Sequence, residues 1–199
     1  MTTRANSRSL RPLPRRAVVG MGLGAAAALA LPWSAHPMPF DPIPSLPRNP
    51  TPGAAGDFAF LTGEWRIANR SIVDGAWLEY PGEATVHAIL NGVGSVEELR
   101  IPARNFSGMG LRLLDVTARV WTDFWVNARS GVLTTPGQTG SFENGAGIFQ
   151  STYDDNGKSM MSVGVWDQIT PTSCRWRQAT SADQGQTWEH NWIMHWTRV

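Results

Sequence analysis

The chain has 199 residues, of which 42% are hydrophobic, and this is enough for a single domain with a buried core. It has 17 basic and 16 acidic residues, but five arginines and no acidic residue fall in the first 35 positions, so the remainder carries a charge near −4. A weakly acidic body with one lysine, Lys158, and one cysteine, Cys174, argues against a nucleic-acid partner and excludes both an intramolecular disulfide and a metal site built on paired thiolates.

Residues 1–35 have the pattern of an export signal. Arginines without acidic neighbours precede an apolar run from Ala17 to Leu31, which is short for a bilayer core of about 30 Å. The pair Arg15-Arg16 before a Gly/Ala-rich stretch resembles a twin-arginine signal. We therefore expect the twin-arginine export machinery as a partner, a periplasmic or secreted protein, and no stable membrane span after cleavage. General secretion and an uncleaved anchor are the alternatives.

The next stretch, residues 36–56, is rich in proline. Its seven prolines fix an extended backbone and remove donors that a sheet needs. We predict a Pro-rich linker over residues 36–56 and a single β-barrel domain over residues 57–199. Asp57 is the predicted N-cap of a short helical turn before the first strand.

From residue 57 onward, short alternating runs of apolar and polar residues are separated by turn residues at intervals of about 8–12 positions. Turn signals such as Asn91-Gly92 and Asn156-Gly157 lie between the runs, as in β-hairpins. About ten strands without long helical periodicity predict an all-β fold, a single antiparallel up-and-down β-barrel whose closure removes exposed edges. The predicted strands are Glu64–Ser71, Ala76–Tyr80, Glu83–Leu90, Ser95–Ile101, Gly108–Asp115, Arg119–Asn127, Gly137–Glu143, Gly145–Tyr153, Lys158–Gln168, Thr172–Ser181 and Trp188–Thr197.

The two ends of this domain resemble the lipocalin and calycin plan. Gly63-Glu64-Trp65 begins the first strand and Arg198 ends the last; in that plan a Gly-x-Trp packs under a cation from the last strand at the closed end. The stretch from Phe60 to Trp65 and the stretch from Asn191 to Val199 are similar to a bacterial lipocalin-like (calycin-type) domain family of unknown function. This resemblance implies the barrel fold over residues 57–199 and no reaction.

Residues 181–188 resemble the Asp-box hairpin that recurs in sialidase propellers. Asp183 is expected to accept backbone hydrogen bonds across the turn, with Thr187 and Trp188 at its base. In propellers the box repeats, whereas here it occurs once. We therefore predict a structural hairpin.

The last predicted strand alternates large side chains, and the same alternation suggests lumen-facing residues on the other strands. Large aromatic rings are good walls for a planar ligand, and Gly164 leaves space between them. We therefore predict an exported protein that holds a small hydrophobic or aromatic molecule in the barrel lumen. The predicted ligand-binding residues are His87, Arg112, Trp121, Trp125, Asn127, Trp166, Trp176, Trp188 and Trp192.

A second hypothesis makes the protein an enzyme. Glu98, Asp123 and His190 are predicted to face the lumen, where apolar surroundings raise the pKa of a carboxyl and an imidazole can exchange protons near neutral pH. They would catalyse a cofactor-independent isomerisation, cyclisation or hydrolysis. The competing structural interpretation pairs Asp123 or Glu98 with an arginine such as Arg112 or Arg100. A structural or interaction barrel without ligand is the third hypothesis.

The sequence predicts neither a metal nor a cofactor. The four histidines are scattered and have no metal-ligand spacing, and no Gly-x-Ser-x-Gly motif or glycine-rich phosphate loop occurs. Haem bound through a lumen histidine is the weaker alternative, with His190 as its ligand.

Overall fold

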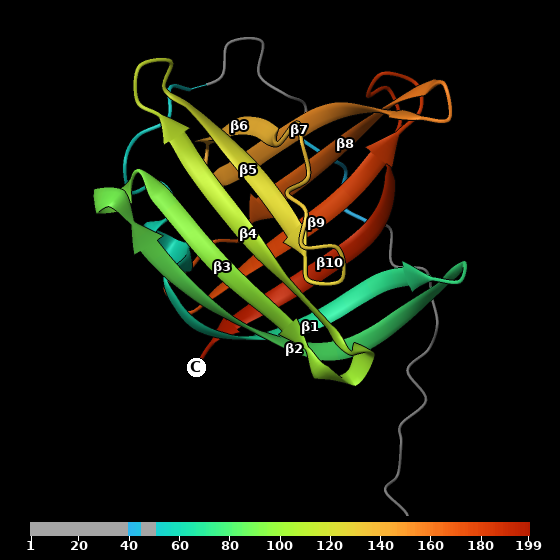
Figure 1. The fold of residues 1–199 in the computed structure, drawn as a ribbon, viewed down its shortest axis with the longest axis horizontal. Helices are drawn as coiled ribbons and strands as arrows, with labels where there is room; N and C mark the ends of the chain where they lie inside the picture. Colours follow the sequence, from blue (N-terminus) through green and yellow to red (C-terminus); the bar gives the residue numbers. More distant parts are fainter. Residues whose placement is uncertain (1–39, 45–50) are drawn as a thin grey trace, which may run out of the picture. The chain divides into compact units, whose positions relative to one another are not determined.

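The described part of the chain forms ten β-strands and three short 3₁₀ helices (Figure 1). The structure is a computed structural model that describes residues 40–44 and 51–199. In chain order the elements are η1 (Ala59–Leu61), β1 (Gly63–Val73), β2 (Ala76–Ile89), η2 (Leu90–Gly92), β3 (Gly94–Ile101), η3 (Pro102–Arg104), β4 (Phe106–Asp115), β5 (Val120–Asn127), β6 (Gln138–Glu143), β7 (Ala146–Asp155), β8 (Lys158–Asp167), β9 (Ser173–Ser181) and β10 (Glu189–Arg198).

The ten strands close into one antiparallel barrel. Each strand pairs with its neighbours along the chain, and β1 pairs with β10, so that Trp65 lies opposite Arg198. Every strand of the barrel therefore has a partner on both sides along at least part of its length, and no strand is an edge strand of the kind that ends a flat sheet. The predicted all-β, up-and-down barrel is confirmed, and it is consistent with a lipocalin-like fold.

One strand is longer than predicted. The sequence predicts separate strands at Ala76–Tyr80 and Glu83–Leu90, because Pro81-Gly82 lies between them. The structure joins the two in β2, where Pro81 pairs with Ala68 of β1, whereas the pairing with β3 begins at Glu83. β3 does not reach Pro81, so this part of β2 has a single neighbour and tolerates a proline as an edge strand does.

The segment before β1 fills the closed end of the barrel. Phe58 and Leu61 are buried in one hydrophobic cluster with Trp65 and Trp196. The indole Nε1 of Trp65 donates a hydrogen bond to the carbonyl oxygen of Leu61 at 2.7 Å. The segment from Phe58 to Leu61, called the plug below, is therefore fixed to the first strand by both packing and a buried hydrogen bond.

Arg198 holds the last strand against this plug. Its guanidinium lies 4.2 Å from the ring centre of Trp65. It also donates hydrogen bonds to the backbone carbonyls of Phe60 at 2.7 Å, Thr62 at 2.6 Å and Pro171 at 2.9 Å. The cation over the first-strand tryptophan that the resemblance implies is confirmed.

Asp57 has a different role from the one predicted. The single-turn helix η1 has Phe58 at its N-cap position and no side-chain cap. The Asp57 carboxylate instead accepts hydrogen bonds from the backbone N of Ala54 at 2.8 Å and from Trp121 Nε1 at 3.0 Å. It therefore joins the segment before the barrel to β5.

The Asp-box hairpin forms as predicted. Asp183 accepts hydrogen bonds from the backbone N of Thr187 at 2.9 Å and from the hydroxyl of Thr187 at 2.6 Å. A third bond comes from the hydroxyl of Ser181 at 2.8 Å. These donors, Thr187 first among them, hold the pKa of Asp183 down to about 2. The predicted backbone bond across the turn is confirmed.

A β-bulge interrupts β10. His190 lies opposite Ala179, and Trp192 lies opposite Gln178, so Asn191 has no partner of its own. The extra residue shifts the two-residue alternation by one position. Residues two apart across the bulge, which would share a face in a regular strand, therefore lie on opposite faces of the sheet. The prediction that the last strand presents one continuous face is therefore wrong: Trp192 faces the lumen, whereas His190 lies on the outer wall.

Part of the predicted linker lies against this outer wall. The guanidinium of Arg177 donates to the backbone oxygen of Asp41 at 2.6 Å, and that of Arg175 pairs with the Asp41 carboxylate at 2.7 Å. Ile43 packs on a cluster of outward-facing side chains. Residues 40–44 of the predicted linker are thus bound to the barrel. The cluster consists of Ile148, Val163, Val165 and Ala179.

The predicted export signal, residues 1–35, lies outside the described residues. Within the ranges that the structure describes, no helix is long and apolar enough to cross a membrane.

Replacing Arg198 by alanine should destabilise the barrel. The substitution removes three hydrogen bonds to backbone carbonyls and the contact with the Trp65 ring. We expect the free energy of unfolding, measured by chemical denaturation, to fall by about 2–3 kcal/mol. Arg66→Ala is the matched control, because Arg66 is exposed on β1. Equal stability of the two variants would contradict the closing role of Arg198.

Candidate functional site

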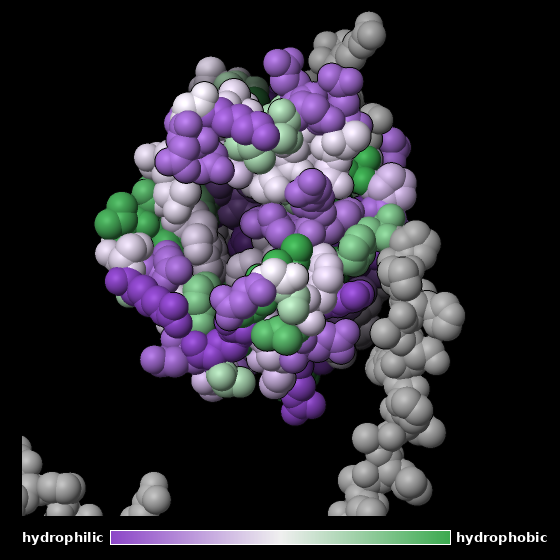
Figure 2. Space-filling view, turned by 90° about the vertical axis from the view of Figure 1, so that its right-hand side faces the viewer, coloured by the Kyte–Doolittle hydropathy of each residue, from purple (hydrophilic) through white to green (hydrophobic). Residues whose placement is uncertain are grey.

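The barrel contains a cavity of about 450 Å³, lined by side chains from β3 to β10. Its lining includes Tyr153, close to the β7–β8 turn, and residues 134–137 of the β5–β6 loop. Figure 2 views the molecule from the right-hand side of Figure 1 and shows that this face is hollowed, with hydrophilic residues around the hollow. The end opposite the Phe58 plug is therefore the candidate mouth of the cavity.

Four tryptophans form much of the cavity wall: Trp125, Trp166, Trp176 and Trp192. The ring centre of Trp176 lies 6.4 Å from that of Trp166 and 5.7 Å from that of Trp192. Trp192 also donates from its indole Nε1 to Asn69 Oδ1 at 3.1 Å. These contacts hold the rings in place, so the aromatic wall is formed before any ligand enters.

Trp125 has its own support on β4. A Cβ atom at Gly108 would collide with the indole, so the glycine allows the ring to lie close to the strand. Phe106 stacks on the same ring at an interplanar angle of 15°, with the centres 6.3 Å apart. Absence of a side chain at Gly108 thus sets the position of this wall.

Three charged side chains meet on the lumen side of β3, β4 and β5: Glu97, Arg112 and Asp123. The Arg112 guanidinium donates from Nη2 to Glu97 Oε2 at 2.6 Å and from Nε to Asp123 Oδ2 at 3.4 Å. Its Cζ lies over the rings of Phe58 and Trp166, 5.3 Å from each ring centre. The third nitrogen, Nη1, is buried without a hydrogen-bond partner among the described residues.

Burial raises the pKa of Asp123 to about 6. The positive charge of Arg112 acts against this rise, and the negative charge of Glu97 adds to it. Burial also lowers the pKa of Arg112, but the charges of Asp123 and Glu97 outweigh it and raise that pKa overall. Arg112 therefore stays a cation, whereas Asp123 can exchange a proton near neutral pH.

The structure brings half of the residues suggested by the sequence into this cavity. They come from β4, β5, β8, β9 and β10 and combine the aromatic wall with two of the three charged groups. Their roles in binding or catalysis stay predictions. The residues are Arg112, Asp123, Trp125, Trp166, Trp176 and Trp192.

Two further predicted ligand-binding residues serve the scaffold. Trp121 is fully buried, and its ring meets Phe58 edge to face with the centres 5.0 Å apart. Asn127 accepts a hydrogen bond through its side-chain oxygen from the backbone N of Arg129 at 2.9 Å, at the start of the β5–β6 loop. Neither side chain lines the cavity.

Glu98 and His87 lie on the outside of the barrel, contrary to the prediction. The Glu98 carboxylate accepts a hydrogen bond from Arg100 at 2.9 Å, and its side chain is 65% exposed. His87 is exposed on β2. The lumen carboxylate of β3 is Glu97, which the sequence analysis missed although it alternates with the apolar Leu99 on the same face.

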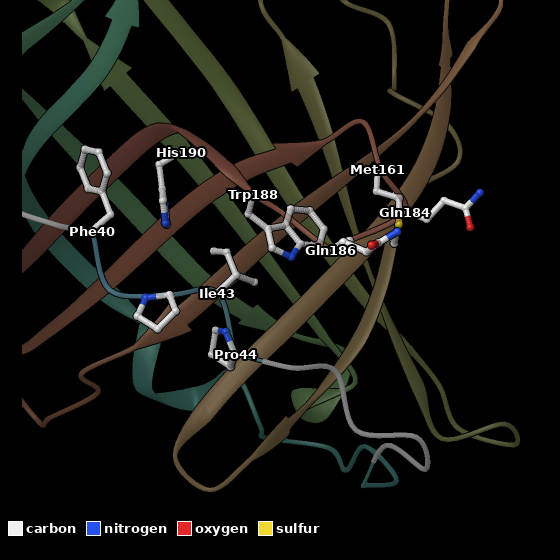
Figure 3. Close-up of a pocket in the computed structure, with 10 residues that line it drawn as sticks. Phe40, Ile43, Pro44, Met161, Gln184, Gln186, Trp188 and His190 are labelled. Atoms are coloured by element: carbon white, nitrogen blue, oxygen red, sulfur yellow. The ribbon is translucent and has the colours of Figure 1, made fainter.

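His190 and Trp188 lie in a groove of about 670 Å³ on the outer wall (Figure 3), so the prediction that they face the lumen is also wrong. The groove runs between residues 40–44 and the Asp-box turn. The His190 ring lies 5.0 Å from that of Phe40, and Trp188 packs on the outer cluster together with Ile43. Burial, together with the nearby charge of Arg177, lowers the pKa of His190.

Metal, haem and thiol chemistry depend on where the histidines, the carboxylates and Cys174 lie. Within residues 40–44 and 51–199, no three His, Cys, Asp or Glu side chains come together as a metal site. The haem alternative named His190 as its ligand, and that ring is outside the lumen. Burial raises the pKa of Cys174 to about 12, so this thiol is not a nucleophile at neutral pH.

The raised pKa of Asp123 predicts an effect on stability. In the folded chain Asp123 has a pKa of about 6, against 3.8 for an ordinary aspartate such as that of the unfolded chain. The folded state therefore binds the proton more tightly, which stabilises the fold at low pH. This stabilisation is lost as the pH rises from about 4 to 6. Asp123→Asn has no such titration. Between pH 4.5 and 7.5 the variant should gain about 2 kcal/mol relative to the native protein, measured by chemical denaturation.

Glu98→Gln is the control for this experiment, because it removes an exposed carboxylate from the outer wall. Its stability relative to the native protein should change little over the same interval. If Asp123→Asn behaves in the same way, the raised pKa of Asp123 is refuted.

Comparison of the chain with protein-family models gave no match, and comparison with curated proteins gave none either.

Proposed function

We propose that the protein holds a small aromatic or apolar molecule in the lumen of the barrel. The observation that carries this proposal is a cavity of about 450 Å³ whose wall contains four positioned tryptophans. This volume is within the range of ordinary ligand pockets, about 300–1,000 Å³. Open space of that size supports a container over a structural barrel filled with side chains.

The polar groups of the cavity also support a ligand site. Gln138 donates to the hydroxyl of Ser162 at 3.0 Å, and Gln178 donates to Asn191 Oδ1 at 3.0 Å. These pairs orient amide groups along the wall. A mostly apolar wall with a few oriented polar groups is typical of sites that select one ligand.

We further propose that the protein is exported to the periplasm or secreted. The support is the sequence of residues 1–35, with its arginines, its Gly/Ala-rich apolar run and its twin-arginine pair. Membership of the bacterial lipocalin-like domain family is part of the same proposal. It is supported by the closed barrel and by the contact between Arg198 and Trp65.

Catalysis is the second candidate function, and one observation favours it. Asp123 lies in the aromatic cavity with a pKa of about 6, which suits a group that accepts and returns a proton at neutral pH. Of the three groups suggested by the sequence, this is the one that lines the cavity. A cofactor-free isomerase or hydrolase of this kind would lose turnover in Asp123→Asn.

Binding is tested with N-phenyl-1-naphthylamine, a neutral aromatic dye whose emission increases in apolar surroundings. Saturable binding to the full-length protein is expected. Trp125→Ala should weaken the affinity about tenfold, because it removes one aromatic wall of the cavity. Fluorescence titration gives both dissociation constants.

Trp77→Ala is the matched control, since the Trp77 ring packs on Phe40 with the centres 5.2 Å apart, on the outer wall. Its affinity for the dye should equal that of the native protein. No saturable binding, or the same loss in both variants, would contradict a lumen site. Circular dichroism shows whether each variant is folded.

A further inference from the structure

We infer that the lumen selects a positively charged ligand, an organic amine with an aromatic or cyclic body whose ammonium group lies beside Asp123 within the tryptophan walls. This inference rests on the proposed function, because it names the chemical class of the ligand in the same cavity.

The lumen carries an excess of negative charge. Among the described residues that line the cavity, the ionisable side chains are Glu97, Arg112, Asp123 and Tyr153. Two carboxyl groups therefore face one guanidinium. A buried charge without a counter-charge is costly, and a ligand cation supplies the one that is missing.

Asp123 is the carboxylate that is better placed to pair with such a ligand. The Glu97 side chain is 3% exposed and receives a short bond of 2.6 Å from Arg112. The Asp123 side chain is 15% exposed, and its contact with Arg112 is longer, at 3.4 Å. Arg112 thus pairs with both carboxylates, but Asp123 has the longer contact and the more exposed side chain, so a ligand cation can approach Asp123 from the cavity.

Arg112 is poorly placed to bind an anionic ligand. Its Nε and Nη2 already donate to carboxylates, and its Cζ lies over the rings of Phe58 and Trp166, 5.3 Å from each ring centre. An anion would be a third negative charge beside a single cation.

The tryptophans strengthen the preference for a cation. The face of an indole ring attracts positive charge, and tryptophan is the strongest side chain in this respect. Trp125 follows Asp123 by two residues on β5, so both side chains point to the same side of the sheet, and both line the cavity. An ammonium group beside Asp123 is thus also next to an aromatic wall.

Three probes with the same naphthalene body test the inference: 1-naphthylmethylamine, a cation at pH 8; 1-naphthalenemethanol, which is neutral; and 1-naphthaleneacetate, an anion. Each competes with bound N-phenyl-1-naphthylamine in the full-length protein, and loss of dye fluorescence gives its affinity. At pH 8 the cation should bind at least tenfold tighter than the alcohol, and the anion should bind most weakly. At pH 5 the preference should shrink, because Asp123, which faces Arg112 and Glu97, takes up a proton.

Two variants locate the effect. Asp123→Asn should bring the affinity of the amine close to that of the alcohol, whereas Glu98→Gln, on the outer wall, should keep the full preference. Equal competition by the three probes, tightest binding of the anion, or an unchanged preference in Asp123→Asn overturns the inference while dye binding still supports the container. Failure of the native protein to bind the dye overturns the proposed function itself.

Discussion

Pairing of β1 with β10 is the constraint on which the rest of the structure depends. It closes the sheet, and closure divides every strand into side chains that face the lumen and side chains that face outward. Arg198 reinforces the seam because it covers Trp65 and binds carbonyls on both sides of it. Once this register is set, the apolar plug around Phe58 has a closed end to fill, and the other end is left for a cavity.

Closure also explains why three charges can be buried together. Glu97, Arg112 and Asp123 come from three neighbouring strands, and the register places Arg112 directly opposite Asp123. Each group alone would carry a large desolvation cost, and the pairing offsets most of it. Two carboxylates against one guanidinium leave the lumen with an excess of acidic groups, and in this respect it differs from a purely apolar container.

The two sides of β9 and β10 show how differently one sheet can be used. Their lumen side carries Trp176 and Trp192, whereas the outer side carries Arg175 and Arg177, which bind Asp41 of the proline-rich segment. Proline suits this segment because it keeps the chain extended while its carbonyl oxygens remain free to accept hydrogen bonds. The outer groove with His190 follows from this packing and is separate from the lumen.

By itself the sequence determined the fold class, nearly all of the strands and the lumen faces of β5, β8 and β9. The two-residue alternation and the turn signals are local, and on β5 the bulky Trp121 and Trp125 mark the inner side and bring Asp123 with them. Only the tertiary structure decided the rest. The bulge at Asn191 moved His190 and Trp188 to the outer wall, and a bulge depends on pairing with β9 rather than on local preference. On β3 both faces carry a glutamate, so the alternation alone does not show which of them points into the lumen. The register of β3 against β4 decides it, because it brings Glu97 within hydrogen-bond distance of Arg112.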